Sequence, residues 1–273
     1  MCRFVAFKGK ERIVLKKLLN ELPNSLISQS RLAKECESGL NADGFGVGWY
    51  DQEIDAEPAV FKSIQPAWND DNLINISSKV RSDCFIGHVR ASTVGDVSIA
   101  NCHPFIYKQF LFAYNGTIHH FNEIKKDLLL LLDQEHFTKI KGQTDSEHFF
   151  FLACNIIEKD LKAAKTLSLA RGLSRGIRRI NQLLENRKLK QEYRINAVLT
   201  DGKAMAAVRY TSNMNNAPLS LYYSKNDSVV IASECLTNIP KDWKEIPVNS
   251  VLTVDEGLQV TIDHISHYVE NEG

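Results

Sequence analysis

The chain has 273 residues, of which 44% are hydrophobic and 24% charged, and its 33 basic and 33 acidic side chains cancel. This length can bury a large core, and the composition is that of a globular protein rather than a disordered or fibrous one. The neutral balance gives no electrostatic reason to expect nucleic acid or a membrane surface as a partner. The longest aliphatic run, Leu128 to Leu132, is too short to cross a bilayer.

Six cysteines are spread along the chain, at positions 2, 36, 84, 102, 154 and 235. No two of them form a Cys-x-x-Cys pair, and the first residues lack the charged and apolar regions of a secretory signal. Together these features favour reduced thiols and a cytoplasmic protein.

A cysteine directly follows the first methionine in the opening segment, residues 1–7. Its small side chain is compatible with removal of Met1, after which Cys2 would carry both a thiol and a free α-amine. The thiolate is the nucleophilic form of cysteine, and an α-amine with a pKa of roughly 7.7–8.0 can accept its proton. One residue would then supply a nucleophile and its base. The plainer interpretation is that Cys2 is a small apolar residue on an edge strand.

The next segments alternate between strand and helix signals. Strand-forming residues fill positions 2–8, and helical spacing follows over 11–20. Ser25 or Ser28 could cap a second helix that runs to about residue 36. A further helix is predicted over 70–80, with Asn69 or Asp70 as its cap.

Three glycines at positions 44, 46 and 48 lie in the segment Asn41 to Tyr50. A dinucleotide fingerprint needs a strand before such glycines and a helix after them, and neither is expected here. We therefore predict a loop that enters a strand, with glycines where the backbone packs closely against another segment or a ligand. Residues 58–63 are expected to pair with this strand as a hairpin.

Two strand ends carry polar groups that suggest a site. The strand over 84–90 ends in Arg90, a cation that requires a carboxylate from a neighbour or from a ligand if it is buried. The strand over 110–116 ends in Asn115-Gly116. These residues favour a type I′ turn, but a helix is predicted to follow over 119–132. A side-chain amide beside a glycine N–H can also offer two donors to one oxygen, as in an oxyanion hole.

A strong helix is predicted from Gly142–Glu147 through Glu158, with a capping box formed by Thr144 and Glu147. Asp145 lies in its first turn, where the helix dipole favours an acid. The alternative is that this carboxylate holds a ligand ammonium group.

Metal-ligating side chains are present without a metal-binding pattern. Cys102 and His103 are adjacent, and His119, His120 and His148 lie farther along, but no tetrahedral set appears at zinc-ligand spacing. We predict neither a metal nor a cofactor.

The segment 159–194 contains eleven lysines and arginines and three acids. Its apolar residues keep helical spacing, which predicts a surface helix with a basic face. A partner or RNA site is the alternative, although no aromatic residues are interleaved for base stacking.

The remainder of the chain consists of predicted strands joined by turns. The strand segments are 195–200, 204–210, 219–224, 228–233, 250–254 and 258–262. No repeat or linker divides the sequence, so we expect one domain over residues 1–273. Two sheets packed together and covered by helices would accommodate this order of elements.

Six motifs in a fixed order then identify a family resemblance. They are Cys2, Asp43-Gly-Phe-Gly46, Gly87-His-Val-Arg-Ala-Ser-Thr93, His103-Pro-Phe105, Asn115-Gly116 and Thr144-Asp-Ser-Glu147. The chain resembles the class II glutamine amidotransferases, which have the N-terminal nucleophile hydrolase fold. It is most similar to the stand-alone YafJ-like subgroup and to γ-glutamyl hydrolases of the ergothioneine and glutathione pathways. Ile231-Ala-Ser-Glu234 is also similar to that subgroup.

This resemblance implies an α+β fold, a four-layer αββα sandwich of two antiparallel sheets. It implies that Cys2 is the nucleophile, with its own α-amine as base, and that the Asn115 side chain and the Gly116 N–H form the oxyanion hole. Arg90, with Thr93 beside it, would bind the α-carboxylate of glutamine, and Asp145 would bind the α-amine.

The implied activity is hydrolysis of the γ-carboxamide of glutamine or of a γ-glutamyl compound through a thioester on Cys2. Two alternatives stay open: a glutaminase subunit that feeds ammonia to a separate synthetase chain, and a non-catalytic regulatory subunit that binds a γ-glutamyl ligand. The sequence departs from better-known members in residues 90–95, where Ala91 and Val94 replace a tryptophan and a histidine. Cys235 stands where the subgroup is expected to have proline.

Overall fold

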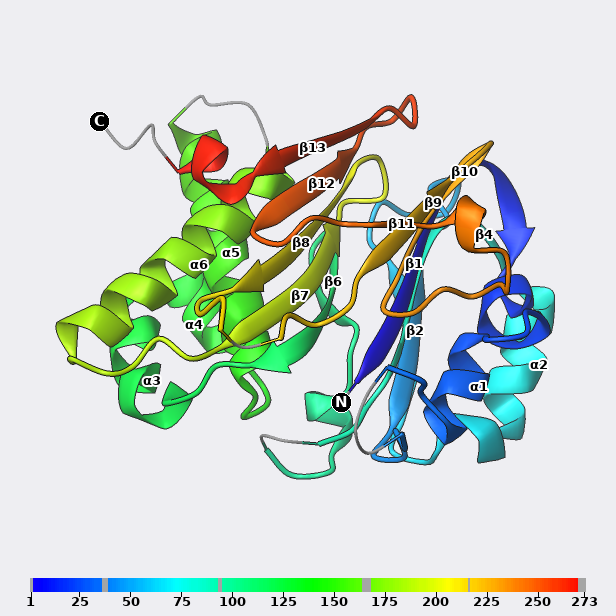
Figure 1. The fold of residues 1–273 in the computed structure, drawn as a ribbon, viewed down its shortest axis with the longest axis horizontal. Coiled ribbons are helices and arrows are strands. Elements are labelled where there is room, and N and C mark those ends of the chain that lie inside the picture. The colour runs from blue at the N-terminus through cyan, green and yellow to red at the C-terminus, as the bar shows by residue number, and fades with distance from the viewer. Residues whose placement is uncertain (1, 36–38, 93–94, 164–167, 216, 270–273) are drawn as a thin grey trace.

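The computed structural model describes residues 2–35, 39–92, 95–163, 168–215 and 217–269. Two antiparallel β-sheets lie face to face, and helices cover the outer face of each (Figure 1). The expected αββα sandwich is confirmed.

The first sheet contains the start of the chain near its centre. Its strands lie in the order β11-β9-β10-β1-β4-β2-β3. Their bounds are Arg3–Val14 (β1), Phe45–Trp49 (β2), Ala59–Ser63 (β3), Arg81–Val89 (β4), Tyr222–Lys225 (β9), Ser228–Ala232 (β10) and Lys244–Glu245 (β11).

The second sheet is built mainly from the later half of the chain. Its strands lie in the order β13-β12-β8-β7-β6-β5. Their bounds are Phe105–Tyr107 (β5), Phe110–Thr117 (β6), Arg194–Thr200 (β7), Met205–Thr211 (β8), Ser250–Val254 (β12) and Val260–His264 (β13).

Short helices cover the first sheet and longer ones cover the second (Figure 1). The first group comprises α1 (Leu26–Arg31), α2 (Asp71–Lys79) and a π-helical turn (Lys17–Glu21). The second comprises α3 (Phe121–Leu131), α4 (Gln134–Lys139), α5 (Asp145–Lys162) and α6 (Leu169–Asn186). Short 3₁₀ turns span Ala67–Asn69, Ile99–Asn101, Pro240–Asp242 and Ile265–Tyr268.

Three clusters of apolar side chains fill the spaces between these four layers. One lies between the sheets and includes Phe4 and Leu252. A second packs the first sheet against α1 and α2, and a third packs the second sheet against α3 to α6. Burial of both faces of each sheet explains why strands such as β6 and β8 read as nearly continuous apolar runs.

Local signals placed most helix starts correctly. Ser25 and Asp70 cap α1 and α2 by accepting hydrogen bonds from Ser28 N (3.3 Å) and Leu73 N (2.9 Å). The hairpin of β2 with β3 is also confirmed. Helix α1 ends at Arg31, several residues before the predicted end near residue 36, which itself lies outside the described residues.

Strand pairing overrode two local signals. The helix expected over 11–20 forms only in the second half of that range, because β1 continues to Val14, where Ile13 and Val14 pair with β4, and the π-helical turn begins at Lys17. Residues 115–116 form no hairpin turn, because β6 extends through them and pairs with β7.

Most of the described part of the basic segment is helical, in the end of α5 and in α6, and several of its arginines have acidic partners. Arg175 donates to the buried Asp160 at 3.0 Å, and Arg187 pairs with Asp127 at 2.7 Å. Its apolar residues, including Ile180, pack into the core. The segment therefore contributes to the packing of α5 and α6. The alternative of a partner or RNA site stays a prediction.

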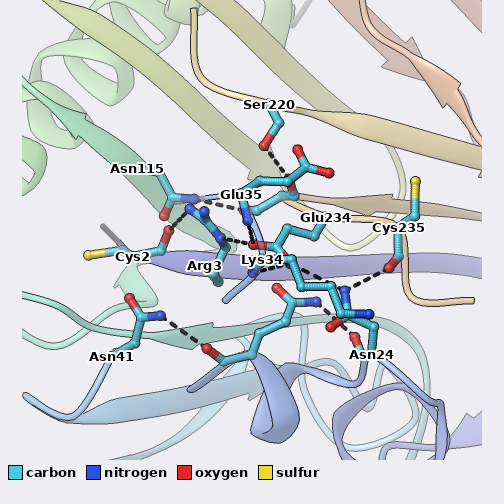
Figure 2. A network of polar contacts seen from close by, with 12 residues as sticks. Cys2, Arg3, Asn24, Lys34, Glu35, Asn41, Asn115, Ser220, Glu234 and Cys235 are labelled. Atoms are coloured by element: carbon cyan, nitrogen blue, oxygen red, sulfur yellow. Dashed lines mark hydrogen bonds and ion pairs between the residues drawn. The ribbon is translucent and has the colours of Figure 1, made fainter. Parts of the chain in front are cut away.

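A buried ion pair fixes the start of β1 (Figure 2). The Arg3 guanidinium donates to Glu234 at 2.8 Å and to the Cys2 carbonyl at 2.9 Å, and both charged side chains are fully buried. The Glu234 carboxylate also accepts from the N–H groups of Lys34 (3.1 Å) and Glu35 (3.0 Å). Burial by itself would raise the pKa of Glu234, but these donors and Arg3 outweigh it, so that the pKa lies below its ordinary value.

We expect Glu234→Ala to lower the free energy of unfolding by about 3–5 kcal/mol, because it leaves the Arg3 guanidinium buried without a counter-charge. Urea unfolding measures this loss. Because folding lowers the pKa of Glu234, its contribution is complete above the pKa of the unfolded chain and is lost as the pH falls through the folded value. The difference in the free energy of unfolding between the wild type and Glu234→Ala should therefore become smaller at acidic pH.

The matched control is Glu21→Ala, which removes an exposed carboxylate 3.5 Å from Lys16. Solvent screens that pair, so its loss should cost less than about 1 kcal/mol. Equal effects of the two substitutions would contradict the structural role assigned to Glu234.

Candidate active site

The pairing of β1 with β4 brings Cys2 and Arg90 together. Arg3 pairs with Val89 in antiparallel register, so the residues just outside this pair, Cys2 and Arg90, face each other across the end of the two strands. The Cys2 thiol donates to the Ala91 carbonyl and accepts from the Ala91 N–H, both at 3.3 Å. The predicted nucleophile and the predicted carboxylate-binding residue thus lie at the same end of two central strands.

The Cys2 thiol is protonated in this environment. Burial raises its pKa, and the Ala91 N–H and the positive charge of Arg90 only partly offset that effect. A nearby base is therefore needed to generate the thiolate.

The predicted glycine loop supports the segment that contacts Cys2. Asp43 N donates to the Arg90 carbonyl (3.0 Å), Arg90 N donates to the Gly44 carbonyl (2.8 Å), and the Asp43 carboxylate accepts from Ser92 N (2.7 Å). Gly44 has a φ of +111°, and a Cβ there would lie 2.7 Å from the Cys102 sulfur. The expectation of close backbone packing at this loop is confirmed.

The Arg90 guanidinium is buried and organises the turn that follows it. It donates to Ser92 Oγ at 3.0 Å and to the carbonyls of Asp96 (3.2 Å) and Gly95 (3.3 Å). These three acceptors are neutral oxygen atoms. Thr93, which the resemblance places beside Arg90, lies outside the described residues.

The predicted oxyanion-hole residues lie near the end of β6 in the second sheet. Gly116 has a φ of +142°, and a Cβ there would collide with the Arg194 carbonyl, which explains the requirement for glycine. The Asn115 side chain is buried, and its Nδ2 donates to Ser233 Oγ at 2.7 Å. Ser233 Oγ also accepts from Phe4 N at 3.0 Å. One hydroxyl therefore joins the strand that carries Cys2 to the strand that carries Asn115.

Asp145 lies at the start of α5 with its carboxylate buried. It accepts hydrogen bonds from Ile118 N (2.7 Å) and Ser146 N (2.9 Å), and it lies 3.5 Å from the Tyr114 hydroxyl. Burial raises the pKa of Asp145 to about 6 in spite of these donors. The acid is thus anchored to the segment directly after β6, close in the chain to Asn115.

The capping box at this helix start is only half formed. Thr144 Oγ1 accepts from Glu147 N at 3.2 Å, as predicted. The Glu147 carboxylate instead accepts from Lys141 N (3.0 Å) and Gly142 N (2.6 Å). It therefore secures the loop before the helix.

Within the described residues, no group of three or more histidine, cysteine or acidic side chains is arranged to hold a metal ion. The Cys102 thiol contacts the carbonyls of Ser98 (3.4 Å) and Ser63 (3.6 Å), and the His103 ring stacks on His88 with centroids 4.2 Å apart. Among the residues that the structure describes, no helix is long and apolar enough to cross a membrane.

Sequence analysis did not predict that Arg3, Ser233 and Glu234 support the site. The signal available was Ser233-Glu234, two polar residues directly after the apolar strand β10. This pattern indicates polar groups at a sheet edge. It does not reveal that their partners are Arg3, Phe4 and Asn115.

Comparisons with known proteins relate this chain to one family. The family model described as "Glutamine amidotransferases class-II" matches residues 22–223. A protein of Saccharomyces cerevisiae named "Probable glutamine amidotransferase DUG3" is 33% identical over 309 aligned residues, which cover 100% of this chain and 87% of that protein. The gamma-glutamyl-hercynylcysteine sulfoxide hydrolase of Mycobacterium tuberculosis is 32% identical over 120 residues, or 43% of this chain and 50% of that enzyme.

Solved structures share the fold. A glutamine aminotransferase class-II domain protein from Silicibacter pomeroyi superposes with a TM-score of 0.69 at 25% identity, covering 96% of this chain and 99% of that one. The glutamine phosphoribosylpyrophosphate amidotransferase of Bacillus subtilis superposes with a TM-score of 0.64 at 16% identity, covering 97% of this chain and 49% of that one, and it supports the fold alone. From the family match, the full-length likeness to the yeast protein and the shared fold, we conclude that this chain belongs to the class II glutamine amidotransferases.

Proposed function

We propose that this protein hydrolyses the γ-carboxamide of glutamine or of a γ-glutamyl compound, with Cys2 as the nucleophile after removal of Met1. The observation that carries the proposal is that Cys2 and Arg90 lie at the same end of two neighbouring strands, and that a hydrogen-bonded link joins β1 to Asn115. The Cys2 thiol contacts the backbone beside Arg90, and Ser233 links the Cys2 strand to Asn115.

In the first half of the reaction, the free α-amine of Cys2 takes the thiol proton and the sulfur attacks the γ-carbonyl carbon. The carbonyl oxygen becomes an oxyanion, which accepts hydrogen bonds from the Asn115 side chain and the Gly116 N–H. Each such donor is worth about 3–4 kcal/mol of transition-state stabilisation. The carbon–nitrogen bond then breaks, and the α-ammonium group gives its proton to the leaving ammonia or amine.

In the second half, water attacks the γ-glutamyl thioester and gives its proton to the α-amine. The carbon–sulfur bond breaks, glutamate leaves, and the Cys2 sulfur takes a proton back. No metal or cofactor is required for these steps, which are acyl transfers with proton transfer at one residue.

Charge complementarity orients the substrate in this proposal. Arg90 binds the α-carboxylate, Thr93 assists beside it, and Asp145 binds the α-ammonium group. A guanidinium and a carboxylate at one site suit a zwitterionic amino acid whose side-chain amide reaches Cys2. The mycobacterial relative is named as a hydrolase of a γ-glutamyl compound, which supports the same substrate class here.

We expect Cys2→Ala to abolish turnover of glutamine and of a panel of γ-glutamyl amines, because it removes the sulfur that forms the thioester. Substrate loss is measured by chromatography, and circular dichroism checks that the fold is retained. A glutamine analogue that alkylates thiols should add its mass to the Cys2 peptide, and an intact mass spectrum should show the chain without Met1.

Cys235→Ala is the matched control, since Cys235 is another free, partly exposed cysteine and should be dispensable. Turnover by Cys2→Ala would rule out the mechanism. A wild-type protein that binds the analogue without labelling would instead support the non-catalytic regulatory subunit. Co-purification of an ammonia-consuming synthetase would support the glutaminase-subunit alternative.

We expect kcat/KM to fall as the pH drops through about 6, the raised pKa of Asp145. Below that pH the carboxyl group is neutral and no longer attracts the substrate ammonium group. The measurement is a pH profile of kcat/KM for glutamine. The α-amine of Cys2 must be unprotonated to take the thiol proton, so it produces an acidic limb of its own near its pKa of roughly 7.7–8.0, and Asp145→Asn should keep that limb. The variant should have a lower kcat/KM throughout and should lack only the further fall near pH 6. An unchanged fall near pH 6 in Asp145→Asn would remove Asp145 from the substrate site.

A further inference from the structure

The Arg90 guanidinium is held by a serine side chain as well as by backbone oxygens. Its Nη2 donates to Ser92 Oγ at 3.0 Å and to the Gly95 carbonyl at 3.3 Å, and its Nη1 donates to the Asp96 carbonyl at 3.2 Å. An arginine side chain has many rotamers, so a guanidinium keeps one direction only where neighbouring groups hold it. Of these three acceptors, the Ser92 hydroxyl is the one that a substitution removes without changing the backbone.

The Ser92 hydroxyl has a defined direction. It donates to the Gly95 carbonyl at 2.9 Å, which uses the hydroxyl proton, because a carbonyl oxygen only accepts. A lone pair of Oγ therefore accepts from Nη2 of Arg90, and a hydrogen bond from a charged donor belongs to the stronger class. Ser92, Gly95 and Arg90 thus contact one another in pairs. Loss of the hydroxyl would remove two of these three contacts.

The backbone of Ser92 is anchored to a different segment of the chain. Its N–H donates to the Asp43 carboxylate at 2.7 Å. Asp43 N donates to the Arg90 carbonyl at 3.0 Å, and Arg90 N donates to the Gly44 carbonyl at 2.8 Å. These bonds join the loop before β2 to the residues that follow β4. Two segments therefore fix the position from which the Ser92 hydroxyl meets the guanidinium.

The residue between Arg90 and Ser92 contacts the thiol of Cys2. The N–H and the carbonyl oxygen of Ala91 each lie within hydrogen-bond distance of Cys2 Sγ, at 3.3 Å. Residues 90–92 thus contact the sulfur through their backbone and fix the direction of the guanidinium through Ser92. In the proposed reaction the substrate contacts Arg90 and Cys2 at once, so the direction of the guanidinium relative to the sulfur affects binding.

We propose that Ser92 is a positioning residue that holds the Arg90 guanidinium in the direction in which it binds the α-carboxylate of the substrate. This inference rests on the proposed function, in which Arg90 binds that carboxylate. Ser92 acts through Arg90 and takes no part in the chemical step. Its loss should weaken substrate binding more than it slows bond cleavage, because the carboxylate contacts Arg90 in both the ground state and the transition state.

The test is a double-mutant cycle of Ser92→Ala and Arg90→Met, read as kcat and KM for glutamine and for a panel of γ-glutamyl amines. We expect Ser92→Ala to raise KM by about 5- to 30-fold with kcat changed less than about threefold. In the Arg90→Met background, Ser92→Ala should lower kcat/KM by less than about twofold. Ser92→Thr retains the hydroxyl and should recover most of the lost affinity.

Ser82→Ala is the matched control. Ser82 lies near the start of β4, at the other end of the strand from Arg90, and its hydroxyl contacts the Tyr50 and Cys84 carbonyls, both at 2.8 Å. Ser82→Ala should lower stability and leave KM unchanged. Equal reductions of kcat/KM by Ser92→Ala in the wild-type and Arg90→Met backgrounds would overturn the proposal, and so would a fall in kcat at unchanged KM.

A second readout does not depend on turnover. In protein labelled with ¹⁵N-arginine, the Arg90 Nη signals are assigned by their absence in Arg90→Met. Bonds from Nη1 and Nη2 to different acceptors hinder rotation of the guanidinium, so we expect separate Nη signals in the wild type and faster exchange between them in Ser92→Ala. Unchanged exchange in Ser92→Ala would overturn the proposal. An inactive wild type with the expected exchange would contradict the proposed hydrolase function and leave the positioning of Arg90 by Ser92 supported.

Discussion

The buried ion pair between Arg3 and Glu234 fixes the position of Cys2 at the start of β1. The rest of the site depends on that position. Arg3 holds the Cys2 carbonyl, and Glu234 is held in turn by backbone N–H groups that follow α1. A buried pair of this kind contributes little net stability compared with an apolar alternative, but removing one partner is costly. Its effect is to give a terminal residue, usually a mobile part of a protein, a single position at a sheet edge.

The two sheets contribute different parts of the site, and their contact surface sets the geometry. Cys2 and Arg90 come from neighbouring strands of the first sheet, whereas Asn115 and Gly116 come from the second. Side chains packed between the sheets fix the separation of these groups, and Ser233 adds a direct hydrogen-bonded link. Close-packed interiors resist small displacements, so the packing between the sheets keeps these groups at a fixed separation.

Burial also sets the charge states of the site. It raises the pKa of both the Cys2 thiol and the Asp145 carboxyl group and keeps His88 neutral. The thiol consequently needs an adjacent base. Removal of Met1 would expose a free α-amine on Cys2 itself, in the same residue as the thiol. The same desolvation thus disfavours spontaneous ionisation and favours specific polar contacts.

The sequence by itself determined the features that depend on neighbouring residues along the chain. The caps at Ser25, Asp70 and Thr144 were predictable because each bonds an N–H three residues ahead. The family motifs predicted which residues form the site. Only the tertiary structure decided that β1 runs to Val14, because β4 pairs with it. Likewise, the contact between Ser233 and Asn115 joins residues 118 positions apart. The spacing of nearby residues cannot predict a partner at that distance along the chain. Hydrogen bonds between distant segments exist only once the sheets have packed, and for that reason the support of the site was beyond the reach of local sequence patterns.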